Sequence, residues 1–270
     1  MPTFSNTQDS VKLFLQSEQA SVSLSSSHLF FYLRDKIQTI PNHAIAVSLL
    51  DAEIPFSFYQ VNANNNLLSG SIGGSNFSFT MNAGNYTAPE LVAELNASFT
   101  NASLTCVLTY SKITNKITLT AGSGVAIVLN ASSTALGLIG FHSNGVLSGT
   151  TTLVSSQGVN VNPIRNVYVK LQNLNIRNRY NKSTSKVIAK VPIDVERNGV
   201  VFYTAHSNIS SYILDPLIDT IELILCDELE RELDFNSMSY SLCLGLVFDR
   251  YLVRDDKQKL IGDELVSLGA

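Results

Sequence analysis

Tryptophan is absent from the sequence, cysteine is rare, and charged side chains are few. The charged fraction is 15% of 270 residues, compared with about 25% in ordinary soluble domains. The three cysteines form no CxxC pair and their number is odd, so neither a disulfide framework nor a zinc site is indicated. No apolar run reaches about 18 residues, so we expect no membrane-spanning helix. The first residues lack the regions of a signal peptide, so we expect folding in the cytoplasm or nucleus.

Motifs of catalysis and cofactor binding are missing as well. The sequence contains no HExxH, GxSxG, P-loop or GxGxxG pattern. Its histidines, His28, His43, His142 and His206, have no spacing typical of a metal site. His28 and His43 are expected to be packed or turn residues beside strands. We therefore expect a protein that is not an enzyme, has no catalytic residue, cofactor or metal ligand, and takes no small-molecule substrate.

Apolar and polar residues alternate along much of the chain. Clear examples are residues 77–81, 167–171 and 242–248. Such alternation indicates strands with one buried face, and about ten such runs separated by turns rich in Asn, Gly and Ser predict a β-sandwich or barrel. Asn198-Gly199 predicts a hairpin between residues 194–196 and 200–203. With 45% hydrophobic residues, the chain is long enough to bury one sizeable core.

One segment has helical periodicity instead. Its apolar stripe consists of Leu91, Val92, Leu95 and Phe99. Thr87 and Glu90 fit a capping box, in which the hydroxyl and the carboxylate accept hydrogen bonds from amides at the start of the helix. We therefore predict a short amphipathic helix over residues 88–99, packed on strands around residues 106–110 and 116–120.

The composition changes along the chain. Between residues 56 and 162 the sequence has only two acidic residues, and Gly, Ser, Thr and Asn are dense. We therefore assign residues 1–65 and 160–270 to a sandwich core, and residues 66–159 to an insertion or elaborated loop region that contains the helix.

Two charged segments follow. Residues 165–190 carry seven basic and no acidic residues, and residues 219–234 carry seven acidic residues and one arginine. Five of the acids lie close together: Asp227, Glu228, Glu230, Glu232 and Asp234. They predict a solvated hairpin tip between strands near residues 221–225 and 240–242. Calcium binding and acid–base catalysis are alternatives, although the spacing fits neither an EF-hand nor a dedicated carboxylate pair.

The basic segment has two interpretations. It forms one polar strand face with a charged turn, or it contacts an acidic partner such as the 219–234 segment of the same or a neighbouring subunit. Nucleic acid is not an expected partner, because the net charge is −4 and no aromatic residues are interleaved in a binding pattern.

Three ordered features resemble a known family. Residues 46–62 read AVSLLDAEIPFSFYQVN, and residues 84–87 (GNYT) lead into the predicted helix, after which residues 135–138 read ALGL. Late strands near residues 221–227 and 241–248 complete the set. Together these features resemble the penton and minor capsid proteins of the jelly-roll lineage of double-stranded DNA viruses, which includes virophages, polinton-like viruses and large eukaryotic DNA viruses.

The resemblance implies an all-β, jelly-roll β-sandwich with an inserted β-rich region. It implies a penton that forms homopentamers at icosahedral vertices of the virion, in contact with the major capsid protein and minor capsid proteins. The segments 1–20 and 250–270 would contain arms that order against neighbours. The family usually has a glycine in the last turn, where this chain has Glu230-Arg231.

Three other functions remain as alternatives. A minor cement protein beneath or between major capsid proteins would have the same fold. A receptor- or glycan-binding adhesin is less favoured because tryptophan is absent, although ten tyrosines could supply aromatic faces. An ordinary extracellular β-domain is the third.

Overall fold

The computed structural model describes residues 10–38, 43–142, 145–176, 178–180, 183–205 and 210–250. The chain divides into two compact units, Met1–Phe58 with Arg165–Ala270, and Tyr59–Ile164. The second unit is therefore inserted into the first, between β4 (His43–Pro55) and β12 (Asn166–Leu171). Among the described helices, none combines the length and hydropathy needed to cross a bilayer.

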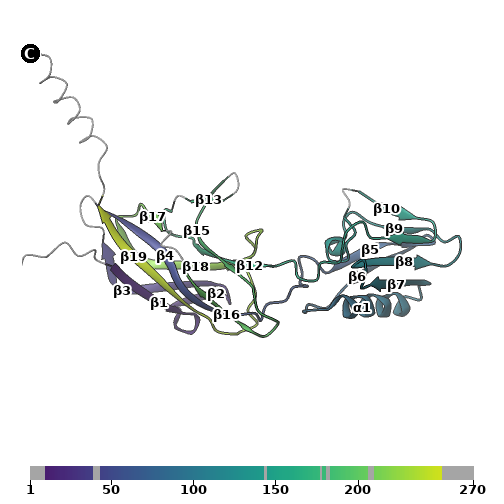
Figure 1. Ribbon diagram of the computed structural model, residues 1–270, viewed down its shortest axis with the longest axis horizontal. Helices are drawn as coiled ribbons and strands as arrows, with labels where there is room; N and C mark the ends of the chain where they lie inside the picture. The colour runs from purple at the N-terminus through teal and green to yellow at the C-terminus, as the bar shows by residue number, and fades with distance from the viewer. Residues whose placement is uncertain are drawn as a thin grey trace, which may run out of the picture. The chain divides into compact units, whose positions relative to one another are not determined.

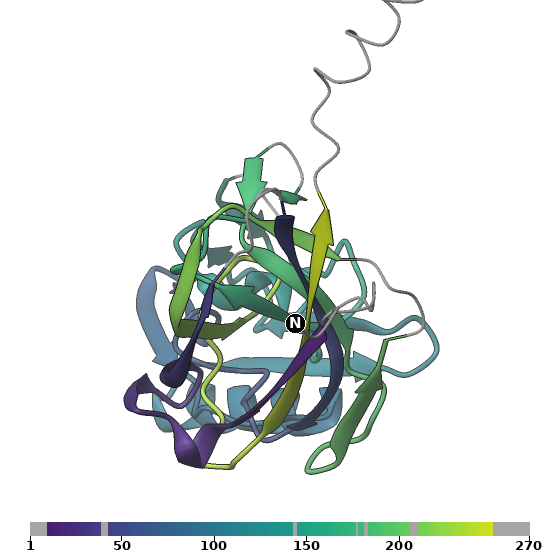
Figure 2. The same cartoon turned by 90° about the vertical axis from the view of Figure 1, so that its left-hand side faces the viewer.

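The first unit contains two antiparallel sheets (Figures 1 and 2). Sheet A has the order β1-β19-β4-β16, and β17 pairs with β4 further along that strand. Its other strands are β1 (Ser10–Gln16), β19 (Ser241–Arg250), β16 (Val200–Thr204) and β17 (Ser211–Ile213). Sheet B has the order β15-β12-β18-β3-β2. Its other strands are β15 (Val187–Pro192), β18 (Leu217–Cys226), β3 (His28–Gln38) and β2 (Val22–Ser25). A 3₁₀ turn, η1 (Ser17–Gln19), and a hairpin of β13 (Asn178–Tyr180) and β14 (Ser183–Ser185) complete the unit.

The chain passes repeatedly from one sheet to the other. Strand β1 lies in sheet A, β2 and β3 in sheet B, β4 in sheet A, and β12 and β15 in sheet B. Strands β16 and β17 return to sheet A, β18 lies in sheet B, and β19 closes sheet A between β1 and β4. This connectivity between two antiparallel sheets is that of a jelly roll. The expected fold class is confirmed.

Two predicted hairpins are wrong for the same reason. Asn198 adopts a left-handed conformation with φ of 62°, and Gly199 N donates to Glu196 O at 3.0 Å, so the predicted turn exists. However, β15 before it pairs with β12, whereas β16 after it pairs with β4. Likewise, β18 and β19 flank residues 227–240 without pairing with each other. Local turn chemistry reverses the chain, but the two-sheet packing selects the partners.

The N-terminal arm expected over residues 1–20 is partly wrong. Residues 10–16 form β1, which is paired along β19 from Ser10 opposite Val247 to Gln16 opposite Ser241. Residues 1–9 and 251–270 lie outside the described residues, so the remainder of both expected arms stays a prediction.

Aromatic side chains close the end of the sandwich where β4 ends and β19 begins. Phe58 and Phe235 pack edge to face with ring centroids 5.7 Å apart, and Phe235 lies 5.1 Å from Tyr240. All three are buried. Full burial of such a side chain stabilises a fold by about 1.5–3 kcal/mol, so this cluster holds the β18–β19 loop against the end of β4 and the start of β19.

The inserted unit packs α1 (Ala88–Asn101) on two small antiparallel sheets (Figure 1). The sheets have the orders β10-β9-β5-β6 and β11-β8-β7. Their strands are β5 (Leu67–Ile72), β6 (Ser75–Thr80), β7 (Cys106–Ser111), β8 (Lys116–Ala121), β9 (Ile127–Leu129), β10 (Leu147–Gly149) and β11 (Thr152–Val154), with a 3₁₀ turn η2 (Thr134–Gly137). The helix and the inward sheet faces enclose one core.

The predicted helix is confirmed and extends to Asn101. Thr87 N donates to Glu90 Oε2 at 2.7 Å and Thr87 Oγ1 accepts from Glu90 N at 3.4 Å, which is the predicted capping box. The amide of Asn96 bonds to both N and O of Leu108, at 2.7 and 3.0 Å. These bonds fasten the helix to β7, one of the strands on which it was predicted to pack.

Gln60 joins the two ends of the inserted unit. Its Nε2 donates to Ile164 O at 2.8 Å, and its Oε1 accepts from Ile164 N at 2.8 Å. Gln60 is 1% exposed and Ile164 is 4% exposed. A single buried side chain therefore closes the unit on itself.

Candidate assembly surface

The outward side of sheet A follows from its register, because directly paired residues lie on the same side of an antiparallel sheet. One cross-strand row consists of Gln16, Ser241, Glu53 and Phe202; the next consists of Phe14, Cys243, Asp51 and Thr204; a third consists of Lys12, Gly245 and Ser48. We term these residues, with Leu50, Val200 and Tyr212, the outer A face. The residues that alternate with these along each strand, such as Leu15 and Val201, point to the other side of the sheet and are buried in the core.

Large apolar side chains are exposed on the outer A face. Phe14 is 72% exposed, Phe202 71% and Tyr212 52%. An antiparallel sheet packed on one side normally turns polar residues toward water on the other. Exposed aromatic residues on neighbouring rows therefore indicate a surface that is stabilised when another protein surface covers it.

The middle of the outer A face combines small residues with a β-bulge. Leu50 is the extra residue of a β-bulge opposite Cys243 and Leu244. A Cβ atom on Gly245 would lie 3.0 Å from Leu50 Cδ2, so a larger residue there would make Leu50 shift away from β19. Cys243 and Ser48 are also small and little exposed. Between Phe14 on β1 and Phe202 on β16, the face therefore exposes the carboxylates of Asp51 and Glu53 rather than large apolar side chains.

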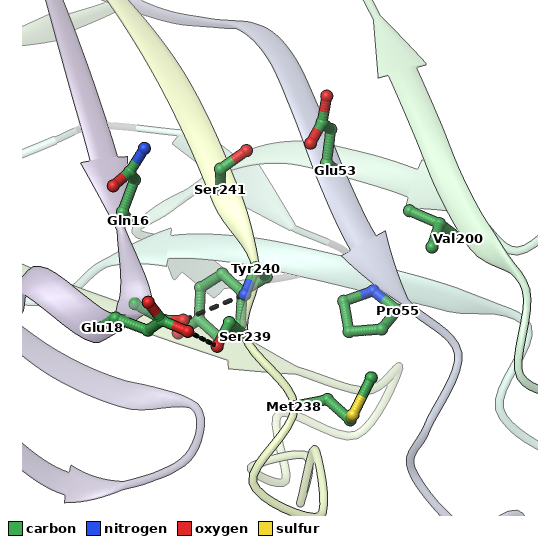
Figure 3. Close-up of a pocket in the computed structure, with 10 residues that line it drawn as sticks. Gln16, Glu18, Glu53, Pro55, Val200, Met238, Ser239, Tyr240 and Ser241 are labelled. Atoms are coloured by element: carbon green, nitrogen blue, oxygen red, sulfur yellow. Dashed lines mark hydrogen bonds between the residues drawn. The ribbon is translucent and has the colours of Figure 1, made fainter.

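A depression of about 380 Å³ lies at one end of the outer A face (Figure 3). Its lining residues are Gln16, Ser17, Glu18, Glu53, Pro55, Val200, Met238, Ser239, Tyr240 and Ser241. Ser239 Oγ donates to Glu18, and Tyr240 N donates to Ser17 Oγ at 2.9 Å, so η1 and the end of the β18–β19 loop are joined. The depression combines two carboxylates with apolar walls and extends the outer A face beyond its strands.

Phe14 and Phe202 were not among the residues predicted to matter. A signal for both is present in the sequence, because Leu13, Phe14 and Leu15 are consecutive apolar residues, as are Val201 and Phe202. Consecutive residues of a strand point to opposite faces, so a run of apolar residues is typical of a strand that is covered on both faces.

The clustered acids do not share a site. Asp227 is buried, and its Oδ2 lies 2.7 Å from Arg231 Nε while its Oδ1 accepts from two backbone amides of the loop. Glu228 Oε1 accepts from the backbone amides of Arg165 and Asn166, both at 2.9 Å. The predicted solvated hairpin tip is therefore wrong for Asp227, because a paired arginine and backbone donors replace its hydration.

The basic segment meets the acidic segment within one subunit. Lys170 Nζ lies 2.9 Å from Glu230 Oε2. Glu230 has a φ of 59°, so the turn at Glu230-Arg231, where a glycine was expected, is formed by a left-handed non-glycine residue. Arg177 and Lys182 lie outside the described residues.

His28 lies between two carboxylates. Its Nε2 is 2.8 Å from Glu222 Oε1 and its Nδ1 is 3.0 Å from Glu232 Oε1. The side chain is 15% exposed, so His28 is packed as expected. Within the described ranges, no three His, Cys, Asp or Glu side chains are grouped as metal ligands. His206 and the side chain of His43 lie outside what the structure describes.

Among the side chains that the structure describes, the exposed tyrosines are spread over separate elements. Tyr32 lies on β3 in sheet B, Tyr212 lies on β17 in sheet A, and Tyr59 belongs to the inserted unit. This distribution does not favour the aromatic platform expected of a glycan-binding adhesin.

Comparison with known proteins identifies the fold. No protein-family model and no curated protein matches the chain. The chain is similar to the mavirus penton protein, with a TM-score of 0.50 and 9% identity over 89% of this chain and 100% of that chain. It is also similar to a chain in the structure of the Sputnik virophage, with a TM-score of 0.45 and 13% identity over 89% of this chain and 98% of that chain. At 9% identity, the likeness to the mavirus protein concerns the jelly-roll fold alone.

Proposed function

We propose that this protein is a structural capsid subunit of a virion, a penton whose five copies form a ring at each icosahedral vertex. The outer A face carries the proposal, because Phe14 and Phe202 are exposed there on a sheet that would be polar in a solitary domain. The fold shared with the mavirus penton protein supports the same role.

The size of the outer A face supports an interface between copies. Four strands about 4.8 Å apart and seven residues of about 3.4 Å each give a footprint of about 450 Å². Specific interfaces bury about 800 Å² on each partner, so the face supplies about half of one, and the depression of Figure 3 adds to it. A ring requires that this face contact a different surface of the next copy, as in any closed heterologous assembly.

The proposal includes two further classes of partner. The ring would contact the major capsid protein around the vertex, and minor capsid proteins, through surfaces outside the subunit interface. The low charge of the sequence supports this, because the cores of protein interfaces are depleted of charged residues.

Light scattering and native mass spectrometry of the full chain test the ring. We expect a pentamer in the wild type. The double variant Phe14→Ser, Phe202→Ser should raise the concentration at which the ring dissociates at least about tenfold, because each subunit loses two buried aromatic contacts. The matched control is Ile113→Ser, which removes a 98% exposed side chain from the β7–β8 turn and should leave the ring unchanged.

The two parts of the proposal fail separately. A wild-type chain that stays monomeric at about 100 µM, far above the Kd of a specific assembly, would refute the penton role. A double variant with an unchanged pentamer would instead show that another surface makes the ring.

A further inference from the structure

A second apolar patch lies on the outward side of sheet B and is covered. Tyr168, Ile224 and Cys226 form it, on paired strands β12 and β18, and they are 8%, 9% and 0% exposed. Their register places them on the same side as His28 and Lys170, and opposite to the core residues of the sheet. We term these three residues the covered B patch.

Val187 of β15 packs against this patch, and the start of the β18–β19 loop lies against it at Cys226. Residues 227–233 fold back along β18, with Glu232 paired to Cys226 and Leu233 N donating to Leu225 O at 3.2 Å. Glu230 and Glu232 lie close enough to Cys226 to act on its thiol, and burial, the main cause, raises the pKa of that thiol to about 12.

Two ion pairs fasten this segment to the sheet. Glu230 binds Lys170 of β12, and Glu232 binds His28 of β3 and accepts from Ser25 Oγ of β2 at 2.8 Å. His28 is in turn bound by Glu222 of β18. Lys170 lies in the same cross-strand row as His28, with Ile224 between them. Its ammonium group is paired with Glu230 rather than with Glu222 or Glu232.

The two contacts of His28 require one proton more than a neutral imidazole and two ionised carboxylates carry together. A neutral imidazole has one N–H and one acceptor nitrogen, yet both nitrogens face carboxylate oxygens within 3.0 Å. Both contacts are hydrogen bonds only if the ring carries two protons or one carboxyl is protonated. Once that proton leaves, one ring nitrogen and one carboxylate face each other as two acceptors, and the contact becomes repulsive.

We propose that His28, Glu222 and Glu232 form a proton-dependent latch that holds residues 227–233 over the covered B patch. The latch is closed while the cluster carries its additional proton. Loss of that proton removes the hold of His28 on Glu232, so the segment opens more often although the Glu230–Lys170 pair and the backbone bonds to Glu228 remain. The latch operates within one subunit and does not depend on the proposed ring.

Cys226 reports the opening directly. In the full chain, the rate of alkylation of Cys226 by iodoacetamide is followed by peptide mass spectrometry and divided by its rate in the denatured chain at the same pH. This ratio corrects for the ionisation of the thiol once it is exposed. Between pH 5 and 9 the corrected rate should rise about tenfold or more, because the lost contact involves charged groups. Cys106, buried in the inserted unit, should show no such rise.

Two variants make the test specific. In Glu232→Gln the amide donates to a neutral ring nitrogen, so the latch should stay closed and the corrected rate should be independent of pH. The control His142→Gln alters an exposed histidine of the inserted unit and should behave as the wild type. A wild-type rate that does not change with pH, or a Glu232→Gln variant that keeps the wild-type pH dependence, would overturn the latch.

Discussion

Replacing Gln60 by methionine tests how the inserted unit is closed. Methionine keeps the length and volume of glutamine but has no amide donor or carbonyl acceptor. The substitution therefore preserves packing at this buried position and removes both hydrogen bonds to Ile164.

The structure sets the size of the effect. Both bonds are 2.8 Å long, and Ile164 is too buried for its backbone groups to be well hydrated once they are released. A buried polar group left without a partner costs about 1–3 kcal/mol. Gln60→Met should therefore lower the free energy of unfolding of the inserted unit by about 2–6 kcal/mol, with both groups counted.

Native-state hydrogen exchange in increasing urea measures each unit separately. Peptides from α1 report on the inserted unit, and peptides from β19 report on the sandwich, whose stability should change little. The matched control Gln157→Met replaces an exposed glutamine of the same unit and should cost less than about 0.5 kcal/mol. A loss below about 1 kcal/mol in the α1 peptides of Gln60→Met would refute the closure by Gln60.

Three further predictions concern single side chains. Tyr240 has a buried hydroxyl without a hydrogen-bond partner, so Tyr240→Phe should stabilise the sandwich by about 1 kcal/mol in urea unfolding; a loss of stability would contradict this. Burial also raises the pKa of Tyr240, so the folded state resists ionisation, and stability that is intact below about pH 10 should fall above it, less steeply in Tyr240→Phe. Thr87→Ala removes the capping box and should lower the stability of α1 by about 1 kcal/mol. Hydrogen exchange should become faster at the start of α1 and stay unchanged at its end. Asn96→Ala frees both backbone groups of Leu108 and should cost about 2 kcal/mol, measured by urea unfolding of the inserted unit; Ser98→Ala, on the same helix, is the control and should cost less.

The candidate surface could be predicted only in part. Low charge and the family resemblance pointed to an assembling protein, and apolar residues of both parities around Phe14 were visible in the sequence. What the sequence could not supply was the neighbourhood of Phe14, because Cys243 and Asp51 meet it only across paired strands. The face is assembled from residues that are far apart along the chain.

The acids show the same division. Their clustering was plain from the sequence, but their roles depend on partners at distant positions. Glu228 binds the backbone at Arg165, and Glu232 binds His28 across most of the length of the chain. Glu230, Glu232 and Asp234 are exposed as a solvated tip requires, but each acid of the cluster also bonds to its own partner, and Asp227 is buried.

The sequence alone determined the local structure. Residues 88–99 form a helix because the stripe and the capping box act within one or two turns, and alternating runs form strands because their apolar side chains share one face. Only the tertiary structure decided which strands pair, since the Asn198-Gly199 turn joins strands of different sheets. The physical reason is range: caps and turns act between residues a few positions apart, whereas sheet partners are selected by burying two apolar faces against each other, which depends on the whole chain at once.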